Sequence, residues 1–151
     1  MSVYNLKSTP AAVDLDALCQ KYISRAAKIG VVGLGYVGLP LACAICDAGF
    51  TTTGFDIDPD KIDKLTRGQS YIGNIHNDKI SGFVKGGIFQ PTAQLDKLAS
   101  MDAVIMCVPT PLDRNREPDM TYIIDTAKSI GKYLKRGQLI VLESTTYPGT
   151  T

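Results

Sequence analysis

The sequence has little that would suit a nucleic-acid-binding, membrane or secreted protein. Its 151 residues carry 16 lysines and arginines against 15 aspartates and glutamates, so the basic excess typical of nucleic-acid binding is missing. No apolar run approaches the roughly 18 residues that a membrane span needs, and residues 1–9 lack the pattern of a secretion signal. We therefore expect no nucleic-acid partner, no membrane partner and a cytoplasmic location.

Cysteine and histidine are too few and too scattered for a disulfide scaffold or a metal centre. The cysteines are Cys19, Cys43, Cys46 and Cys107, and His76 is the only histidine. Cys43 and Cys46 form a C-x-x-C pair, but they fall inside a predicted helix and have no second pair at metal-ligand spacing. We interpret all four as reduced core residues and predict no metal site.

One amphipathic segment, residues 8–27, precedes the rest of the chain. Thr9 or Asp14 is suited to cap a helix here. Its apolar side chains share one helical face: Leu15, Leu18, Cys19, Tyr22 and Ile23. We predict that residues 1–27 form an N-terminal helical extension that packs on the next domain, with a partner-binding helix as the alternative.

From Lys28 onward, short apolar strands alternate with helices. The strands are predicted at 28–32, 51–57, 89–92, 103–108 and 139–142, and the helices at 37–48, 58–67, 78–84, 94–99 and 120–135. The runs at 103–108 and 139–142 are typical of strands buried on both faces. The alternation predicts an α/β fold with a doubly wound parallel sheet over residues 28–151. Because Pro148-Gly149 is suited to begin another helix, we expect the sequence to be a fragment.

A glycine-rich turn joins the first of these strands to its helix. Residues 33–38 read GLGYVG, a G-x-G-x-x-G pattern in the strand-to-helix context where it binds dinucleotides. Gly33 permits the tight turn, Gly35 lets the backbone approach a pyrophosphate, and Gly38 allows close helix packing. The helix amides then attract the pyrophosphate. The pattern predicts a Rossmann domain, with a glycine turn that binds no ligand as the alternative.

An acidic residue ends the second predicted strand. Asp56 lies about 20 residues beyond the glycines, where a carboxylate accepts hydrogen bonds from the adenosine ribose. The same charge would repel the 2′-phosphate of NADP, so we predict NAD as the cofactor, with Lys61 softening that preference. A solvated carboxylate at a strand end is the alternative.

The two later buried strands are followed by hydroxyl and proline residues. Pro109-Thr110-Pro111 follows one of them, and Glu143-Ser144-Thr145-Thr146 follows the other. Both segments fall at the carboxyl edge of the predicted sheet, where ligands of open α/β folds bind. Their hydroxyls can contact the nicotinamide half of the cofactor, or they can simply build turns.

These motifs together resemble the amino-terminal domain of the UDP-glucose/GDP-mannose dehydrogenase family. The resemblance rests on KIGVVGLGYVGLP at 28–40, Asp56, CVPTPL at 107–112 and ESTTYPGTT at 143–151, and it covers nearly everything from Lys28 onward. Within the family, residues 115–120 and the form of the last motif look most like UDP-N-acetylglucosamine 6-dehydrogenases. Dehydrogenases of UDP-glucose and UDP-N-acetylmannosamine are the alternatives.

The resemblance implies oxidation of a sugar primary alcohol to a carboxylate with two NAD⁺ in succession, in the synthesis of polysaccharide precursors. In such enzymes a cysteine captures the aldehyde and a second hydride transfer gives a thioester, which water cleaves. That cysteine, and the lysine and asparagine that stabilise the oxyanion, have no counterpart here. We therefore expect this chain to be inactive alone, and the full-length protein to bind a UDP-sugar as a homo-oligomer.

The resemblance also assigns roles to individual positions. Glu143 is implied as a supporting carboxylate, and Thr146 as a residue that touches the cofactor and positions water, with Tyr147 beside it. The implied contacts of the pyrophosphate are Gly33, Gly35, Tyr36, Val37 and Gly38, and those of the adenosine ribose are Asp56 and Lys61. The implied contacts of the remaining part of the cofactor are Pro109, Thr110, Pro111, Thr145 and Thr146.

Two readings of another class remain open. A non-catalytic NAD-sensing module would keep the same glycine turn and Asp56, and so would a Rossmann enzyme of another substrate class, such as a hydroxy-acid dehydrogenase. A cysteine in a glycine-rich loop further along the chain, with a lysine and an asparagine on one helix, would favour the nucleotide-sugar dehydrogenase.

Overall fold

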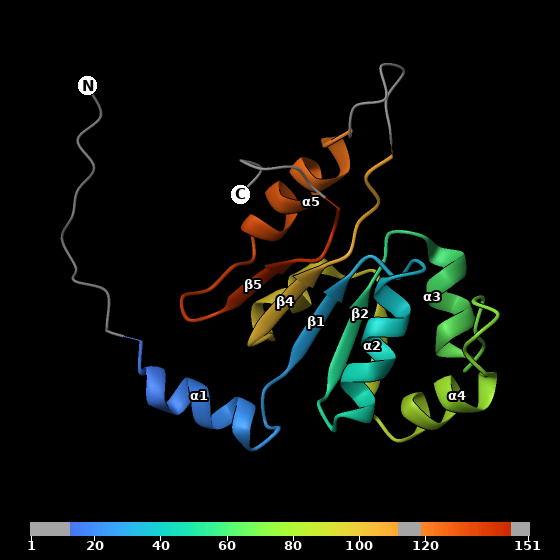
Figure 1. Cartoon of the computed structure of the whole chain (residues 1–151), viewed down its shortest axis with the longest axis horizontal. Helices are drawn as coiled ribbons and strands as arrows, with labels where there is room; N and C mark the ends of the chain where they lie inside the picture. Colours follow the sequence, from blue (N-terminus) through green and yellow to red (C-terminus); the bar gives the residue numbers. More distant parts are fainter. Residues whose placement is uncertain (1–12, 112–118, 146–151) are drawn as a thin grey trace.

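The centre of the molecule is a five-stranded parallel sheet with the strand order β3-β2-β1-β4-β5, shown in Figure 1. The computed structural model describes residues 13–111 and 119–145. From β1 the chain winds outward through β2 and β3, and then returns to the other side of β1 for β4 and β5. The predicted doubly wound α/β fold is therefore confirmed. The strands are β1 (Ile29–Val32), β2 (Thr52–Phe55), β3 (Phe89–Thr92), β4 (Ala103–Met106) and β5 (Leu139–Leu142).

Helices cover both faces of this sheet. Val31 belongs to a core that includes residues of α2, α3 and α4, and Val32 belongs to a second core with residues of the 3₁₀ helix η1 and of α5. Successive residues of a strand point to opposite faces, which accounts for the two cores. Among the described residues, no helix is long and apolar enough to cross a membrane. The helices are α2 (Gly38–Asp47), α3 (Pro59–Thr66), α4 (Asn77–Lys85), η1 (Leu95–Ser100) and α5 (Thr121–Gly131).

The predicted helix and strand positions hold, with shifts at the ends. β4 stops at Met106 instead of residue 108, α5 stops at Gly131 instead of residue 135, and the helical turn at 94–99 is a 3₁₀ helix. The start of α3 follows from Asp58, whose side chain accepts a hydrogen bond from the amide of Asp60. That is the usual way in which an aspartate caps a helix.

The N-terminal helix α1 (Leu15–Ile23) contacts the domain through Lys21 and Tyr22, and much of its apolar face is exposed. Lys21 Nζ lies 2.7 Å from Asp102 Oδ1, and the Tyr22 hydroxyl donates to the Asp102 carbonyl. Leu15 and Ile23 are 67% and 71% exposed, and α1 has no buried residue. The predicted packing of this face on the domain holds only in part, because Tyr22 packs against the core of Ala27, Ile29 and Ala103 and Leu18 is half-buried. Cys19, predicted to be a core residue, is exposed.

The last strand is also less buried than predicted. Within the described part of the chain β5 pairs with β4 alone, and Leu139 and Ile140 are 51% and 40% exposed. A continuous apolar run predicts cover on both faces, but β5 lies at the edge of the sheet, where the described residues cover it only in part. The other predicted core strand, β4, is buried at three of its four positions.

Candidate functional site

The sheet register brings the predicted site residues to one edge. Val32 is level with Phe55 and with Met106, and Met106 is level with Leu142. The next residues of these four strands, namely Gly33, Asp56, Cys107 and Glu143, therefore begin the loops along the carboxyl edge, which is where ligands of open α/β sheets bind.

Close contacts fix the shape of the glycine turn after β1. Gly33 has a φ of +91°, and a β-carbon on it would lie 2.6 Å from the carbonyl oxygen of Cys107. A β-carbon on Gly38 would lie 1.7 Å from the carbonyl oxygen of Gly33. Only a residue without a side chain fits either position, so the start of α2 lies directly against the turn.

Gly35, at the middle of the turn, differs from its two neighbours. A β-carbon built on Gly35 would meet nothing within 4 Å, so the missing side chain leaves open space in the cavity. The amides of Gly35, Tyr36 and Val37 donate to no described residue, and α2 has no side-chain cap. Uncapped amides at a helix start are suited to an anionic group such as a diphosphate.

The carboxylate of Asp56 is held firmly beside this turn. Its Oδ2 accepts from the amide of Leu34 at 2.8 Å and from Lys61 Nζ at 3.1 Å, and its Oδ1 accepts from the amide of Asp58 at 3.0 Å. The side chain is 7% exposed. Each carboxylate oxygen can accept about two hydrogen bonds, so Oδ1 keeps one free position and Lys61 keeps donors to spare.

A cavity of about 940 Å³ runs along the carboxyl edge, near the upper end of the range for ligand sites, about 300–1,000 Å³. Of the predicted residues, Gly38 and Pro111 do not line it, and Thr146 lies outside the described residues, as does Tyr147. The predicted residues that do line it are Gly33, Gly35, Tyr36, Val37, Asp56, Lys61, Pro109, Thr110, Glu143 and Thr145.

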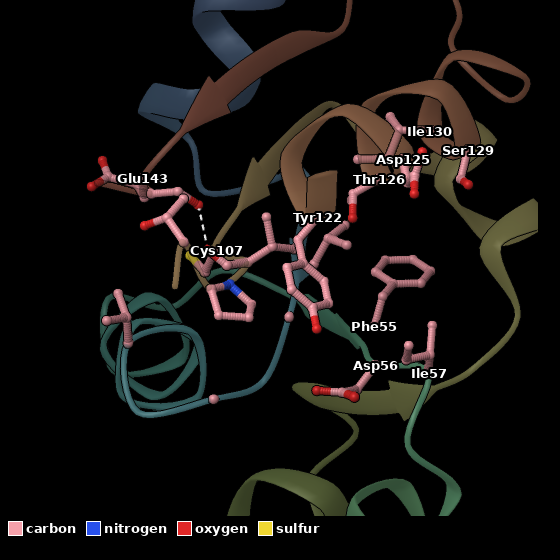
Figure 2. Close-up of a pocket in the computed structure, with 18 of the residues that line it drawn as sticks. Phe55, Asp56, Ile57, Cys107, Tyr122, Asp125, Thr126, Ser129, Ile130 and Glu143 are labelled. Carbon is pink, nitrogen blue, oxygen red and sulfur yellow. Dashed lines mark hydrogen bonds between the residues drawn. The ribbon is translucent and has the colours of Figure 1, made fainter. Parts of the chain in front are cut away.

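One wall of the cavity comes from α5, which the sequence analysis did not include in the site. Figure 2 shows Tyr122 and Thr126 on α5 facing the end of β2, where Asp56 and Ile57 lie, while Glu143 lies at the far side near Cys107. Ile57 is 89% exposed at the cavity rim. The cavity-lining residues of α5 are Thr121, Tyr122, Asp125, Thr126, Ser129 and Ile130. Their helical spacing, at steps of three and four, was the signal that could have found them.

The cysteines at this end of the sheet are poor nucleophiles. Burial, and to a lesser extent Glu143, raises the pKa of Cys107 to about 11. Burial is also the main cause that raises the pKa of Cys43 to about 11. A thiol reacts as its thiolate, so both thiols stay protonated and unreactive near neutral pH. Cys43 and Cys46 are core residues of α2, as predicted.

The parallel sheet, the glycine turn at the start of α2 and the acid at the end of β2 define a dinucleotide-binding α/β domain. A family model describes this domain: residues 27–151 match the UDP-glucose/GDP-mannose dehydrogenase family, NAD binding domain. The chain belongs to that family, and its cofactor is NAD.

Known relatives agree with this assignment. The chain is 39% identical over 124 residues to UDP-N-acetyl-D-glucosamine 6-dehydrogenase of Pseudomonas aeruginosa (82% of this chain, 28% of the relative). It is 38% identical to UDP-N-acetyl-D-mannosamine dehydrogenase of Yersinia pestis (82% and 29%). The structure of a ternary complex of GDP-mannose dehydrogenase from Pseudomonas aeruginosa superposes with a TM-score of 0.77 at 29% identity (81% and 29%). The chain thus spans less than a third of these relatives.

Proposed function

We propose that this chain is the cofactor-binding part of a nucleotide-sugar 6-dehydrogenase, an enzyme that oxidises the primary alcohol of a UDP-sugar to a carboxylate with two NAD⁺. The observation that carries the proposal is that the open side of Gly35 and the carboxylate of Asp56 line one cavity. A diphosphate site and a ribose site in one cavity suit a dinucleotide.

The residues of the cavity fit NAD in a defined orientation. The amides of Gly35, Tyr36 and Val37 would bind the diphosphate, since they donate to no described residue. The free position on Asp56 Oδ1 would accept from one ribose hydroxyl, and Lys61, 3.1 Å from the carboxylate, would donate to the other. A 2′-phosphate would be placed against the carboxylate of Asp56, which favours NAD over NADP.

The nicotinamide half would lie along the ends of β4 and β5. NAD supplies the hydride acceptor for the oxidation, and this chain supplies the surfaces that orient its ring. We propose that Pro109, Thr110 and Thr145, which line the cavity, contact this half of the cofactor. Glu143 and Thr146 are proposed as the supporting carboxylate and the residue that positions water.

Titration calorimetry with NAD and NADP tests the assignment of Asp56. We expect the unaltered chain to bind NAD more tightly than NADP. Asp56→Asn should weaken NAD binding about tenfold and reduce the difference in affinity between NAD and NADP. Asp60→Asn is the matched control, because Asp60 also carries a carboxylate near the start of α3 but is exposed and does not line the cavity. Equal affinity of the unaltered chain for both cofactors would contradict the assignment.

UDP-N-acetylglucosamine is the proposed sugar substrate. The proposal is supported by the relative from Pseudomonas aeruginosa at 39% identity, with UDP-N-acetylmannosamine and UDP-glucose as the alternatives. The natural protein that carries this domain should be assayed with all three sugars while NADH is followed by absorbance. We expect two NADH per sugar and the highest kcat/KM with UDP-N-acetylglucosamine. NADH from none of them would favour the non-catalytic module.

A further inference from the structure

A tyrosine that does not line the cavity contacts the glycine turn from behind. Tyr71 lies in the loop between α3 and α4, and its hydroxyl donates to the carbonyl oxygen of Leu34 at 2.6 Å. Leu34 is the residue between the first two glycines of the turn, and the two contacting residues are 37 positions apart in the sequence. The contact joins a separate segment of the chain to the backbone that approaches the cofactor.

Leu34 is held through both of its backbone polar groups. Its amide donates to Asp56 Oδ2 at 2.8 Å, its carbonyl accepts from Tyr71, and its side chain is fully buried. The preceding amide, that of Gly33, donates to the carbonyl of Phe55 at 2.8 Å. The peptide groups on both sides of Leu34 therefore have fixed orientations. The carboxylate that faces the ribose site sets the first, and Tyr71 sets the second, which contains the free amide of Gly35.

The loop around Tyr71 is itself well anchored. The amide of Ser70 donates to Asn77 Oδ1 at 2.8 Å, and the amide of Ile72 donates to Ser70 Oγ at 3.1 Å. The side chain of Ile72 is 6% exposed and belongs to the core that includes residues of α2, α3 and α4. At the start of the loop, a β-carbon on Gly68 would lie 2.8 Å from the Cα of Ser81. Tyr71 is thus presented to the turn by a packed segment.

The hydroxyl of Tyr71 is a permanent donor. Burial, then the charges of Asp56 and Asp58, raise its pKa well above the usual value for tyrosine. The proton therefore stays on the hydroxyl near neutral pH, and the Leu34 carbonyl is its acceptor.

We propose that Tyr71 is a positioning residue for the cofactor: it orients the Leu34 peptide so that the amides of Gly35, Tyr36 and Val37 face the cavity ready for a diphosphate. The inference deepens the proposed function and rests on it. Hydrogen bonds aligned before a ligand arrives reduce the cost of ordering on binding, so the effect of Tyr71 should appear in the affinity for the diphosphate part of the cofactor.

The test compares Tyr71→Phe with Tyr22→Phe, because Tyr22 also donates its hydroxyl to a backbone carbonyl, that of Asp102, at the far end of the sheet. NAD and ADP are titrated by calorimetry, and adenosine, which lacks the diphosphate, by NMR. We expect Tyr71→Phe to weaken NAD and ADP about threefold to tenfold, the usual worth of one hydrogen bond, and adenosine less than twofold. The amide NMR signals of Gly35 and Tyr36 should shift in this variant and stay in place in Tyr22→Phe.

Three results would overturn the inference. Unchanged NAD and ADP affinities with unmoved Gly35 and Tyr36 signals would show that the hydroxyl does not set the turn. Equal weakening of all three ligands, or the same loss in Tyr22→Phe, would show a general loosening of the fold. An unaltered chain that binds neither NAD nor ADP would overturn the proposed function, and this inference with it; the unaltered chain thus separates the two failures.

Discussion

The loops at the ends of β1 and β2 share a buried carboxylate, whereas the loop after β5 begins with an exposed one and is joined to the end of β4 through Ser144, whose hydroxyl donates to the Val108 carbonyl. On the first side, Asp56 accepts hydrogen bonds from the amides of Leu34 and Asp58 and is 7% exposed. On the second side, Glu143 is exposed, and the strand before it has half-exposed residues at Leu139 and Ile140. Both sides line the same cavity.

The difference separates the two halves of the proposed cofactor site. The half that would bind the adenosine diphosphate is built from β1, β2, α2 and the loop that carries Tyr71, and hydrogen bonds to Asp56 and from Tyr71 hold its backbone in place. The half that would bind the nicotinamide rests on an edge strand with little cover. Within the described residues, the proposed adenosine diphosphate half is therefore the better supported of the two.

The largest expected effect comes from two alanine substitutions in the glycine turn. In Gly38→Ala the new methyl group would lie 1.7 Å from the carbonyl oxygen of Gly33, so we expect a loss of at least about 4 kcal/mol of folding free energy. In Gly35→Ala the methyl group meets nothing within 4 Å, so the folding free energy should change by less than about 0.5 kcal/mol. NAD binding should fall at least tenfold, because hydrogen bonds to an anionic group usually contribute about 1.5 kcal/mol or more.

Urea denaturation and NAD titration of the two variants check this contrast. Gly35→Ala serves as the control for Gly38→Ala, since both add one methyl group to the same turn. If Gly35→Ala bound NAD like the unaltered chain, the diphosphate would not approach the turn at Gly35, and the comparison between the two halves would lose its basis.

A second pair compares the centre of the sheet with its edge. Val104 and Ile140 are level with each other on β4 and β5, but Val104 is fully buried and Ile140 is 40% exposed. We expect Val104→Ala to cost about 2 kcal/mol of folding free energy, because it leaves a cavity, and Ile140→Ala to cost about 1 kcal/mol or less. Urea denaturation measures both. Equal losses would show that β5 is as well packed as β4 in solution.

The fold could be predicted because β1, β4 and β5 are short apolar runs that alternate with helices and turns. The runs at 89–92 and 139–142 were predicted to the residue, and β3 is an edge strand that tolerates Pro91. The sequence did not predict which elements would pack on the apolar face of α1 or on β5. Apolar periodicity shows that α1 has one apolar face, and an apolar run shows that β5 is a strand, but neither pattern contains the element that would pack on it.

The position of the candidate site residues at one edge of the sheet could be predicted where it depends on short sequence motifs. The glycine turn and Asp56 form a local motif, and their geometry could be expected from residue types and spacing. The contact of Tyr71 with Leu34 spans 37 positions and joins a loop to a turn, so no periodicity indicates it. The cavity wall from α5 could be predicted only in part. The sequence shows that its residues share a helical face, but only the fold shows that this face lines the cavity.

A pH-dependent effect is expected at Cys107, which follows β4 between the two halves. Burial first, and Glu143 second, raise its pKa to about 11 from 9.0. A raised pKa in the folded state means that the thiol's contribution to stability is complete below the unfolded value and is lost as pH rises through the folded value. We therefore expect the chain to lose stability between about pH 9 and about pH 11, and Cys107→Ala to remove about 1–2 kcal/mol of that loss.

Glu143→Gln separates the two causes of the raised Cys107 pKa, because it removes the charge of Glu143 and leaves the burial of the thiol intact. Since burial is the larger cause, the variant should keep most of the alkaline loss, and the difference from the unaltered chain should be about 0.5 kcal/mol or less. Urea denaturation at pH 8 and about pH 10.5 gives the loss for each protein, and Cys19→Ala, at an exposed position, controls for the removal of a thiol. If Glu143→Gln abolished the loss, Glu143 would lie against the thiol in solution, and the end of β5 would be as closed as the ends of β1 and β2.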